Sequence, residues 1–157
     1  MSAGGSLTAY LRTLDRIAES KLDSDVSIKI TQFGVDLSTD ACLDNVRVLA
    51  CRAKEIGSRV EVDMEDSRYT ETTLRIVELV GRETGVIRVA IQAYLYRTPA
   101  DIERLNAAGV MVRLCKGAYI EPASAAMPKK SDVDAAYIAM GKKLLDHGTY
   151  PALGTHD

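Results

Sequence analysis

Short apolar stretches rich in valine and isoleucine recur along the chain, and longer amphipathic stretches separate them. Runs of this composition, bounded by glycine or by polar clusters, are typical of buried β-strands. The pattern predicts five strands, at Val26–Thr31, Arg59–Asp63, Val86–Tyr94, Val110–Leu114 and the final segment Tyr150–Asp157.

The amphipathic stretches carry apolar residues at helical spacing, and capping signals mark their ends. Gly57 and Gly148 act as helix stops. Pro99 after Thr98 is typical of the first helical position, and Ser131 with Asp134 resembles a capping box. Helices are therefore predicted after an N-cap at Ser6, over Thr39–Ile56 and Thr70–Arg82, from the N-cap Thr98 to a stop at Gly109, and over Ser131–His147.

Alternating strands and helices build βα units with parallel strands, which form either a doubly wound sheet or a (β/α)8 barrel. No G-x-G-x-x-G sequence follows a predicted strand, which weighs against a dinucleotide-binding Rossmann site. A barrel typically needs about 200 residues or more, so we expect an α/β fold that is a partial (β/α)8, TIM-like barrel with about five of the eight βα units. Residues 1–25 would supply a helix leading into the barrel, and residues 26–157 the partial barrel domain.

Composition narrows the classes of partner. The 157 residues are 46% hydrophobic and 27% charged, with a formal net charge of −2. Lysine and arginine are dispersed, so we expect no nucleic-acid partner and instead a small molecule. Three cysteines without a C-x-x-C pair indicate free thiols in a reducing compartment, and two histidines alone support no metal site. The sequence has neither a membrane-spanning run nor the pattern of a signal peptide, so we expect a cytoplasmic chain.

Polar residues stand at the carboxyl end of each predicted strand, and the stretch Met111–Pro122, MVRLCKGAYIEP, is the richest in them. Parallel strands bring these ends to one edge of the sheet, where α/β folds bind ligands. Each residue taken singly is more often solvated surface, but their recurrence at matching strand ends indicates a binding site. These residues are Lys29, Asp63, Gln92, Arg113 with Lys116, and Thr155 with His156.

Five strings, SIKITQFG, VEVDMEDSRYT, IQAYLYRT, VRLCKGAYIEP and THD, occur in this order at the predicted strand ends. Together they resemble the FAD-dependent proline dehydrogenase family, in particular its monofunctional bacterial type. The resemblance implies a (β/α)8 barrel that holds FAD and oxidises L-proline to 1-pyrroline-5-carboxylate, the first step of proline catabolism. It also implies electron transfer to a quinone or another acceptor, which would bring the protein to the inner face of the membrane.

The resemblance assigns roles to individual residues. Lys29 matches a lysine that contacts the substrate carboxylate, and Asp63 and Arg113 match catalytic residues, the arginine addressing the flavin ring. The residues that match cofactor contacts are Met64, Gln92, Lys116, Gly117, Ala118, Thr155 and His156.

Physical chemistry is consistent with these roles. A fixed guanidinium such as Arg113 can stabilise negative charge that grows on a flavin during hydride transfer. Lys116 beside Gly117 suits a diphosphate or ribityl oxygen, because glycine allows close approach of the backbone. Asp63 could pair with Lys29 across the mouth of the barrel.

Two other classes of function stay open. A lyase of the barrel class could use Lys29 or Lys116 to form a Schiff base with a carbonyl substrate. A non-catalytic fragment is the third hypothesis, because the family clamps the proline carboxylate with an arginine pair on its final helix, a segment we expect beyond Asp157. Open strand edges in a partial barrel would favour self-association.

Overall fold

The computed structural model describes residues 2–156 and contains one parallel sheet of five strands. The spatial order β1-β2-β3-β4-β5 follows the order along the chain, and each strand runs parallel to its neighbour. A doubly wound sheet would reverse its order at a switch point, so this order confirms an α/β fold of the partial (β/α)8-barrel type. The strands are β1 Val26–Ile28, β2 Val60–Val62, β3 Ile87–Gln92, β4 Met111–Cys115 and β5 Thr149–Leu153.

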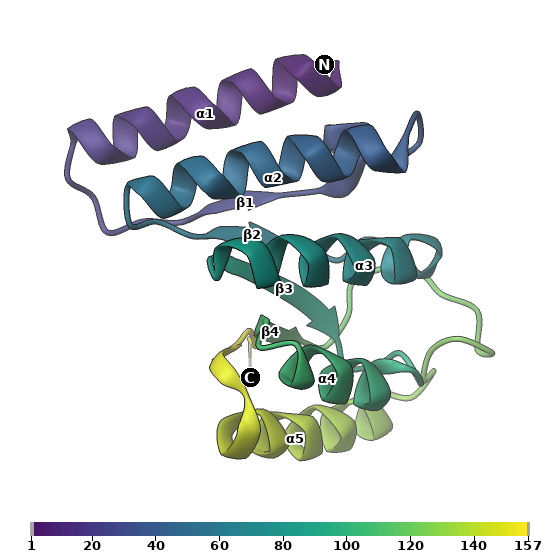
Figure 1. Ribbon diagram of the computed structural model, residues 1–157. Helices are drawn as coiled ribbons and strands as arrows, with labels where there is room; N and C mark the ends of the chain where they lie inside the picture. Colours follow the sequence, from purple (N-terminus) through teal and green to yellow (C-terminus); the bar gives the residue numbers. More distant parts are fainter. Residues whose placement is uncertain (1, 157) are drawn as a thin grey trace.

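The helices form a layer beside the sheet and follow the same order (Figure 1). The helix α1 lies against α2 at one end of this layer, α3 occupies the middle, and α4 and α5 lie side by side at the other end (Figure 1). The bounds are α1 Ala3–Glu19, the 3-10 helix η1 Ile30–Phe33, α2 Thr39–Glu55, α3 Ser67–Thr84, α4 Thr98–Ala107 and α5 Lys130–His147.

The hydrophobic core lies between the sheet and the helices. Alternate strand residues face the helices, because successive side chains of a strand point to opposite sides of the sheet. Val62, Val89 and Val112 stand opposite one another on three neighbouring strands and belong to this core. The residues between them, such as Glu61 and Arg113, lie on the other face, which in a closed barrel is the interior.

Two predicted boundaries near the amino terminus are wrong. The first helix begins earlier than predicted, because Ser2 rather than Ser6 is its N-cap and accepts a hydrogen bond from the backbone N–H of Gly5. Ser6 is buried inside the helix. The first strand ends at Ile28, since the chain turns at Lys29 into η1 instead of continuing to Thr31.

Two further helix starts, those of α3 and α4, differ from the prediction. The helix α3 begins at Ser67 because the Asp66 carboxylate accepts from the backbone N–H of Arg68. The N-cap of α4 is Arg97, and the Thr98 hydroxyl instead donates to the carbonyl of Gln92 at 2.6 Å, which ties the helix to the end of β3.

The predicted capping box at the start of α5 is also wrong. Lys129 is the N-cap residue and makes no side-chain capping bond. The Asp134 carboxylate instead accepts from two lysines, Lys116 and Lys130, at 2.6 Å each. This residue therefore links the helix to the loop after β4.

Candidate active site

A cavity of about 540 Å³ opens beside the carboxyl ends of β4 and β5. Six of the ten residues singled out in the sequence line it, although they come from two strand ends about 40 residues apart in the chain. Its lining consists of Arg113, Cys115, Lys116, Gly117, Ala118, Lys130, Gly154, Thr155 and His156. The two strand ends thus meet as the alternation of strands and helices predicted.

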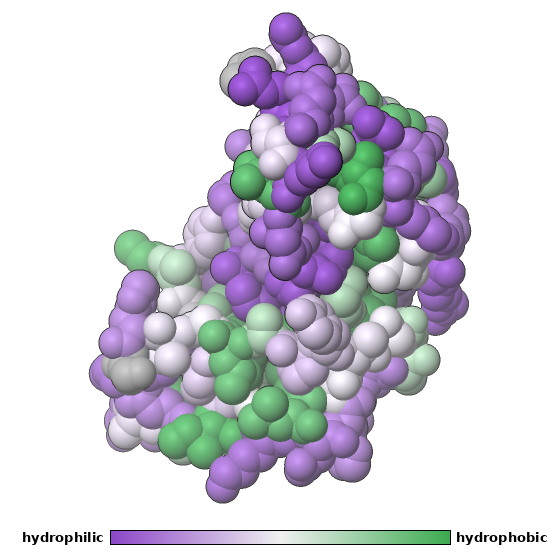
Figure 2. Space-filling view, turned by 90° about the vertical axis from the view of Figure 1, so that its left-hand side faces the viewer, coloured by the Kyte–Doolittle hydropathy of each residue, from purple (hydrophilic) through white to green (hydrophobic). Residues whose placement is uncertain are grey.

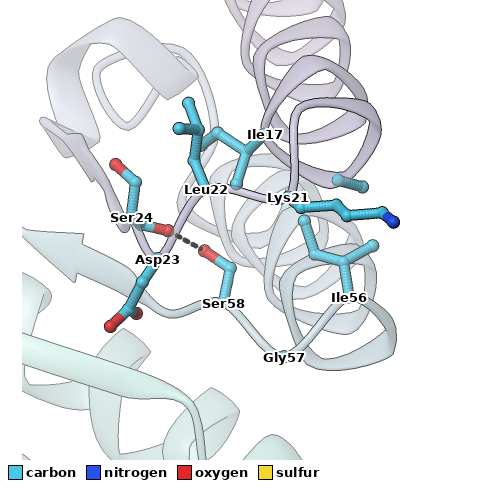
Figure 3. Close-up of a pocket in the computed structure, with 9 residues that line it drawn as sticks. Ile17, Lys21, Leu22, Asp23, Ser24, Ile56, Gly57 and Ser58 are labelled. Carbon is cyan, nitrogen blue, oxygen red and sulfur yellow. Dashed lines mark hydrogen bonds between the residues drawn. The ribbon is translucent and has the colours of Figure 1, made fainter.

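A second cavity, of about 450 Å³, lies at the opposite end of the sheet (Figure 3). The turns after α1 and α2 form it, and the Ser58 hydroxyl donates to the Ser24 carbonyl across it at 2.8 Å (Figure 3). None of the residues singled out in the sequence lines this cavity. In barrels the amino-terminal end of the strands contributes to stability rather than to catalysis, so the first cavity is the candidate active site.

Gly117 shapes the loop that follows β4. Its φ of 131° lies in a region that side chains rarely adopt, and a Cβ placed on it would overlap the ring of Tyr94. The Tyr94 hydroxyl in turn donates to the carbonyl of Tyr119 at 3.1 Å. The backbone of Gly117 therefore lies directly against an aromatic ring, and only glycine fits there.

Gln92 holds the loop after β4 in place through its side chain. Its side chain is 3% exposed, and both ends of the amide are engaged: Nε2 donates to the carbonyl of Glu65 at 3.0 Å, and Oε1 accepts from the backbone N–H of Ala118 at 3.2 Å. The glutamine predicted to contact a flavin thus connects the loop after β2 to the loop after β4.

Lys29, Asp63 and Arg113 form a continuous row of ion pairs at the carboxyl ends of three strands. Lys29 Nζ lies 2.8 Å from one oxygen of Asp63, and Arg113 Nη2 lies 2.7 Å from the other. This confirms the predicted pairing of Lys29 with Asp63. The hydrogen bond that Lys29 donates to Asp63 raises the pKa of Lys29 despite a smaller opposing effect of burial, so the amine stays protonated.

Positive charge dominates the lining of the cavity. Arg113, Lys116 and Lys130 line it, and the two lysines share the carboxylate of Asp134. Hydrogen bonds from both lysines lower the pKa of Asp134, which keeps it ionised. The carboxylates that pair with these three cations, Asp134, Asp63 and Glu61, are not among the lining residues, so the cavity surface favours an anionic ligand.

Three lining residues were not predicted: Cys115, Lys130 and Gly154. Lys130 lies at the start of α5, which the sequence placed after a long loop, so nothing in the local pattern pointed to it. Cys115 was interpreted as a packed thiol: its Sγ donates to the carbonyl of Ile91 at 3.2 Å, and burial raises its pKa. A protonated thiol is a poor nucleophile, which agrees with that interpretation.

Met64 lies away from the cavity. It is 6% exposed and packs in the hydrophobic core, so its contact with a flavin stays a prediction. Within residues 2–156, no group of three or more histidine, cysteine, aspartate or glutamate side chains could hold a metal ion. None of the helices in this part of the chain is long and apolar enough to cross a membrane.

The fold and the site define a β/α-barrel protein with a cationic ligand cavity at the carboxyl ends of its strands. The chain belongs to the proline dehydrogenase family, whose family model matches residues 2–157. It is 38% identical to proline dehydrogenase 1 of Bacillus subtilis subsp. natto over 146 residues. The matched region covers 93% of this chain and 48% of that protein. Proline dehydrogenase of Deinococcus radiodurans is 36% identical over 137 residues, 84% of this chain and 44% of that protein.

Solved structures agree on the fold. The proline utilization A protein of Bdellovibrio bacteriovorus superposes with a TM-score of 0.86 at 24% identity, over 99% of this chain and 21% of that one. The same protein from Corynebacterium freiburgense gives a TM-score of 0.84 at 22% identity, over 99% of this chain and 19% of that one. The chain spans about half the length of the bacterial relatives that it matches.

Proposed function

We propose that this chain carries the cofactor-binding part of an enzyme that uses FAD to oxidise L-proline to 1-pyrroline-5-carboxylate. The observation that carries the proposal is the cavity beside β4 and β5, which gathers six residues that the sequence had assigned to this chemistry. Family membership supports the substrate class, because the relatives are named proline dehydrogenases.

The residues present fit FAD. Gly117 and Ala118 of the loop after β4 line the cavity together with two lysines, Lys116 and Lys130. Backbone groups and ammonium groups of this kind hold the diphosphate of a dinucleotide. We assign Lys116, Gly117 and Ala118 to the diphosphate and ribityl part, and Arg113 to the flavin ring. Bound flavin would supply the hydride acceptor, which the side chains themselves lack.

The remaining cofactor assignments are Thr155, His156, Met64 and Gln92. Thr155 and His156 line the cavity from the end of β5. Gln92 and Met64 do not line the cavity and would support the cofactor site indirectly. Gln92 would do so by fixing the loop at Ala118, and Met64 by packing next to Asp63.

The row Lys29, Asp63, Arg113 supplies the catalytic charges. Asp63 holds both cations, and the three groups together carry one net positive charge. Arg113 would stabilise negative charge beside the ring, since a guanidinium stays protonated and fixed by its partner. Lys29, 41% exposed in its side chain, would attract the carboxylate of proline.

The lyase alternative requires a lysine that loses its proton near neutral pH. Asp63 raises the pKa of Lys29, which works against such a nucleophile. Lys116 is held by Asp134 at 2.6 Å. Both observations favour the dehydrogenase over Schiff-base chemistry.

Further proposals concern location and partners. Electrons would pass from the flavin to a quinone or another acceptor, with the protein in the cytoplasm and in contact with the inner face of the membrane during transfer. Residues 1–25 would act as the segment leading into the barrel and residues 26–157 as the barrel domain, since α1 packs against α2 and η1.

The test is a visible absorption spectrum of the purified chain after incubation with FAD and desalting, followed by anaerobic addition of L-proline. We expect a retained flavin band that bleaches with L-proline and stays unchanged with D-proline as the control. A band that persists would leave a cofactor site without a working substrate site. Absence of the band would contradict the proposal and favour a non-catalytic fragment.

A further inference from the structure

Charged side chains of alternating sign cross the inward face of the sheet from its amino end to its carboxyl end. Asp25 lies 3.0 Å from Arg59 and 3.8 Å from Arg88, and Arg88 lies 3.4 Å from Glu61. The series continues into the candidate active site. In spatial order its members are Arg59, Asp25, Arg88, Glu61, Arg113, Asp63 and Lys29.

Glu61 is the carboxylate that joins the site to the sheet interior. One oxygen lies 3.0 Å from Arg113 Nε and the other 3.4 Å from Arg88 Nη1. Its side chain is 11% exposed and that of Arg88 is 13% exposed, against 36% for Arg113. Glu61 is therefore shielded from solvent where the catalytic arginine is not.

Two carboxylates flank the Arg113 guanidinium at two of its nitrogens. Asp63 accepts a hydrogen bond from Nη2, and Glu61 Oε1 lies 3.0 Å from Nε as an ion pair without hydrogen-bond geometry. A guanidinium attracted at two points is restrained in its rotation, whereas one contact leaves it free to pivot. Asp63 is also paired with Lys29, the residue assigned to substrate. Glu61 is instead also paired with Arg88, which lies further from the cavity and is 13% exposed in its side chain.

We propose that Glu61 is a positioning residue that orients the guanidinium of Arg113 toward the cofactor cavity. The inference rests on the proposed function for its purpose, though not for its geometry. Burying a carboxylate has a desolvation cost that an apolar residue would avoid. Ala90 and Met111 show that this face of the sheet also accommodates apolar side chains. The charge at position 61 is therefore not needed for packing, and we explain it by the contact of Glu61 with Arg113.

The first measurement needs no flavin. The NMR order parameter of the Arg113 Nε–H bond reports how firmly the guanidinium is held. We expect a value of about 0.8 in the parent chain and below about 0.6 in Glu61→Gln, the ranges of rigid and mobile groups. An unchanged order parameter in Glu61→Gln would overturn the proposal whatever the chain does with FAD.

Glu78→Gln is the matched control. The Glu78 side chain is 14% exposed and pairs with Arg104 at 2.6 Å in the helix layer, away from the cavity. This variant should loosen Arg104 and leave Arg113 rigid. Equal loosening of Arg113 in both variants would mean a general loss of order and would contradict a specific role of Glu61.

The second measurement is the dissociation constant of FAD. We expect Glu61→Gln to raise it about tenfold, through the loss of one close ion pair to Arg113, and Glu78→Gln to leave it unchanged. If the parent chain binds no FAD, the proposed function fails, while the order parameters still decide the role of Glu61.

A double variant separates positioning from folding. Glu61→Gln leaves the largely shielded Arg88 with only Asp25, at 3.8 Å, as its counter-charge, which could disturb the fold by itself. Glu61→Gln with Arg88→Met removes that weakly paired cation and should restore stability, yet Arg113 would remain mobile and FAD binding weak. Recovery of FAD affinity in the double variant would show that Glu61→Gln weakened FAD binding only by destabilising the fold, and would overturn the proposal.

Discussion

At the scale of single residues, Gly117 combines two constraints, a positive φ and a steric conflict with a neighbouring side chain. Its backbone has φ of 131°, and the space where a Cβ would lie is filled by the Tyr94 ring. Gly109 also has a positive φ, of 68°, but nothing lies within 4 Å of its missing Cβ. A comparison of Gly109 with Gly117 therefore distinguishes the effect of backbone strain alone from that of strain combined with a steric conflict.

We expect Gly117→Ala to displace the loop after β4 and to weaken FAD binding by about tenfold or more, with a loss of unfolding free energy of about 1–3 kcal/mol. Gly109→Ala should lower stability by about 1 kcal/mol and leave FAD affinity unchanged. Flavin titration and urea unfolding of both variants provide the check. Equal FAD affinities would place the cofactor away from Gly117.

The buried thiol of Cys42 predicts a pH dependence of stability. Burial raises its pKa from 9.0 to about 11, and its Sγ donates to the carbonyl of Ile30 at 3.6 Å. The folded pKa exceeds the unfolded one, so this contribution is complete below pH 9 and is lost as the pH rises through 11.

We expect the parent chain to lose at most about 1.4 kcal/mol per pKa unit of this shift between those pH values, and Cys42→Ala to lose less over the same range. Exposed Cys51 gives the control, because Cys51→Ala should follow the parent curve. Urea unfolding at several alkaline pH values measures the difference. Parallel curves for all three chains would assign the thiol no part in alkaline unfolding.

The sequence predicted which residues lie at the site better than it predicted which side chains they pair with. The strand-end pattern placed Arg113, Lys116 and His156 at one site because alternation and chain order determine which strand ends meet. The partner of Asp134 was missed, since capping and ion pairing favour the same residue type and only the path of the chain distinguishes them. Glu61 was missed for a similar reason: a charge inside a short strand has no local signal for what lies opposite.

At the scale of elements, a buried side-chain hydroxyl ties the end of β3 to the start of α4. Thr98 is 1% exposed and donates to the carbonyl of Gln92, the residue that fixes the loop at Ala118. Proline at position 99 correctly predicted the helix but not its first residue, because Thr98 bonds to the preceding strand instead of capping its own helix.

Thr98→Val should therefore remove one of two hydrogen bonds that the Gln92 carbonyl accepts, the other coming from the backbone N–H of Leu95, and lower the free energy of unfolding by about 0.5–1.5 kcal/mol. Thr13→Val is the control, since the exposed Thr13 hydroxyl donates to the carbonyl of Ala9 within α1. That change should cost less than about 0.5 kcal/mol. Thermal and urea unfolding compare the two, and similar losses would refute a special role for the Thr98 contact.

At the scale of the whole molecule, β5 pairs with β4 alone and lies at an edge of the sheet. Leu153 of β5 is 45% exposed, and Ile138 and Leu145 of the adjacent α5 are 58% and 64% exposed. Figure 2 shows hydrophobic residues gathered in the lower half of one face, at the height where Figure 1 places α5 and β5. An edge strand with apolar surroundings favours pairing with another chain.

We expect the chain to self-associate at micromolar concentrations and Leu153→Lys to make it monomeric, because a lysine at a strand edge opposes pairing. Leu79 on α3 is 44% exposed and supplies the matched variant Leu79→Lys, which should associate like the parent. Sedimentation velocity over a range of concentrations measures this. Association that survives Leu153→Lys would place the contact elsewhere.

The charges on the inward face of the sheet also restrict which pairings of the strands can form. In β2, Glu61 stands between Val60 and Val62, so a slip of one position would exchange charged and apolar sides. Glu61 would then enter the layer of helices without a counter-charge, and both valines would leave it, at a cost of several kcal/mol. A misaligned sheet is thereby excluded during folding, so the residues that serve the site also select the correct alignment of the strands that build it.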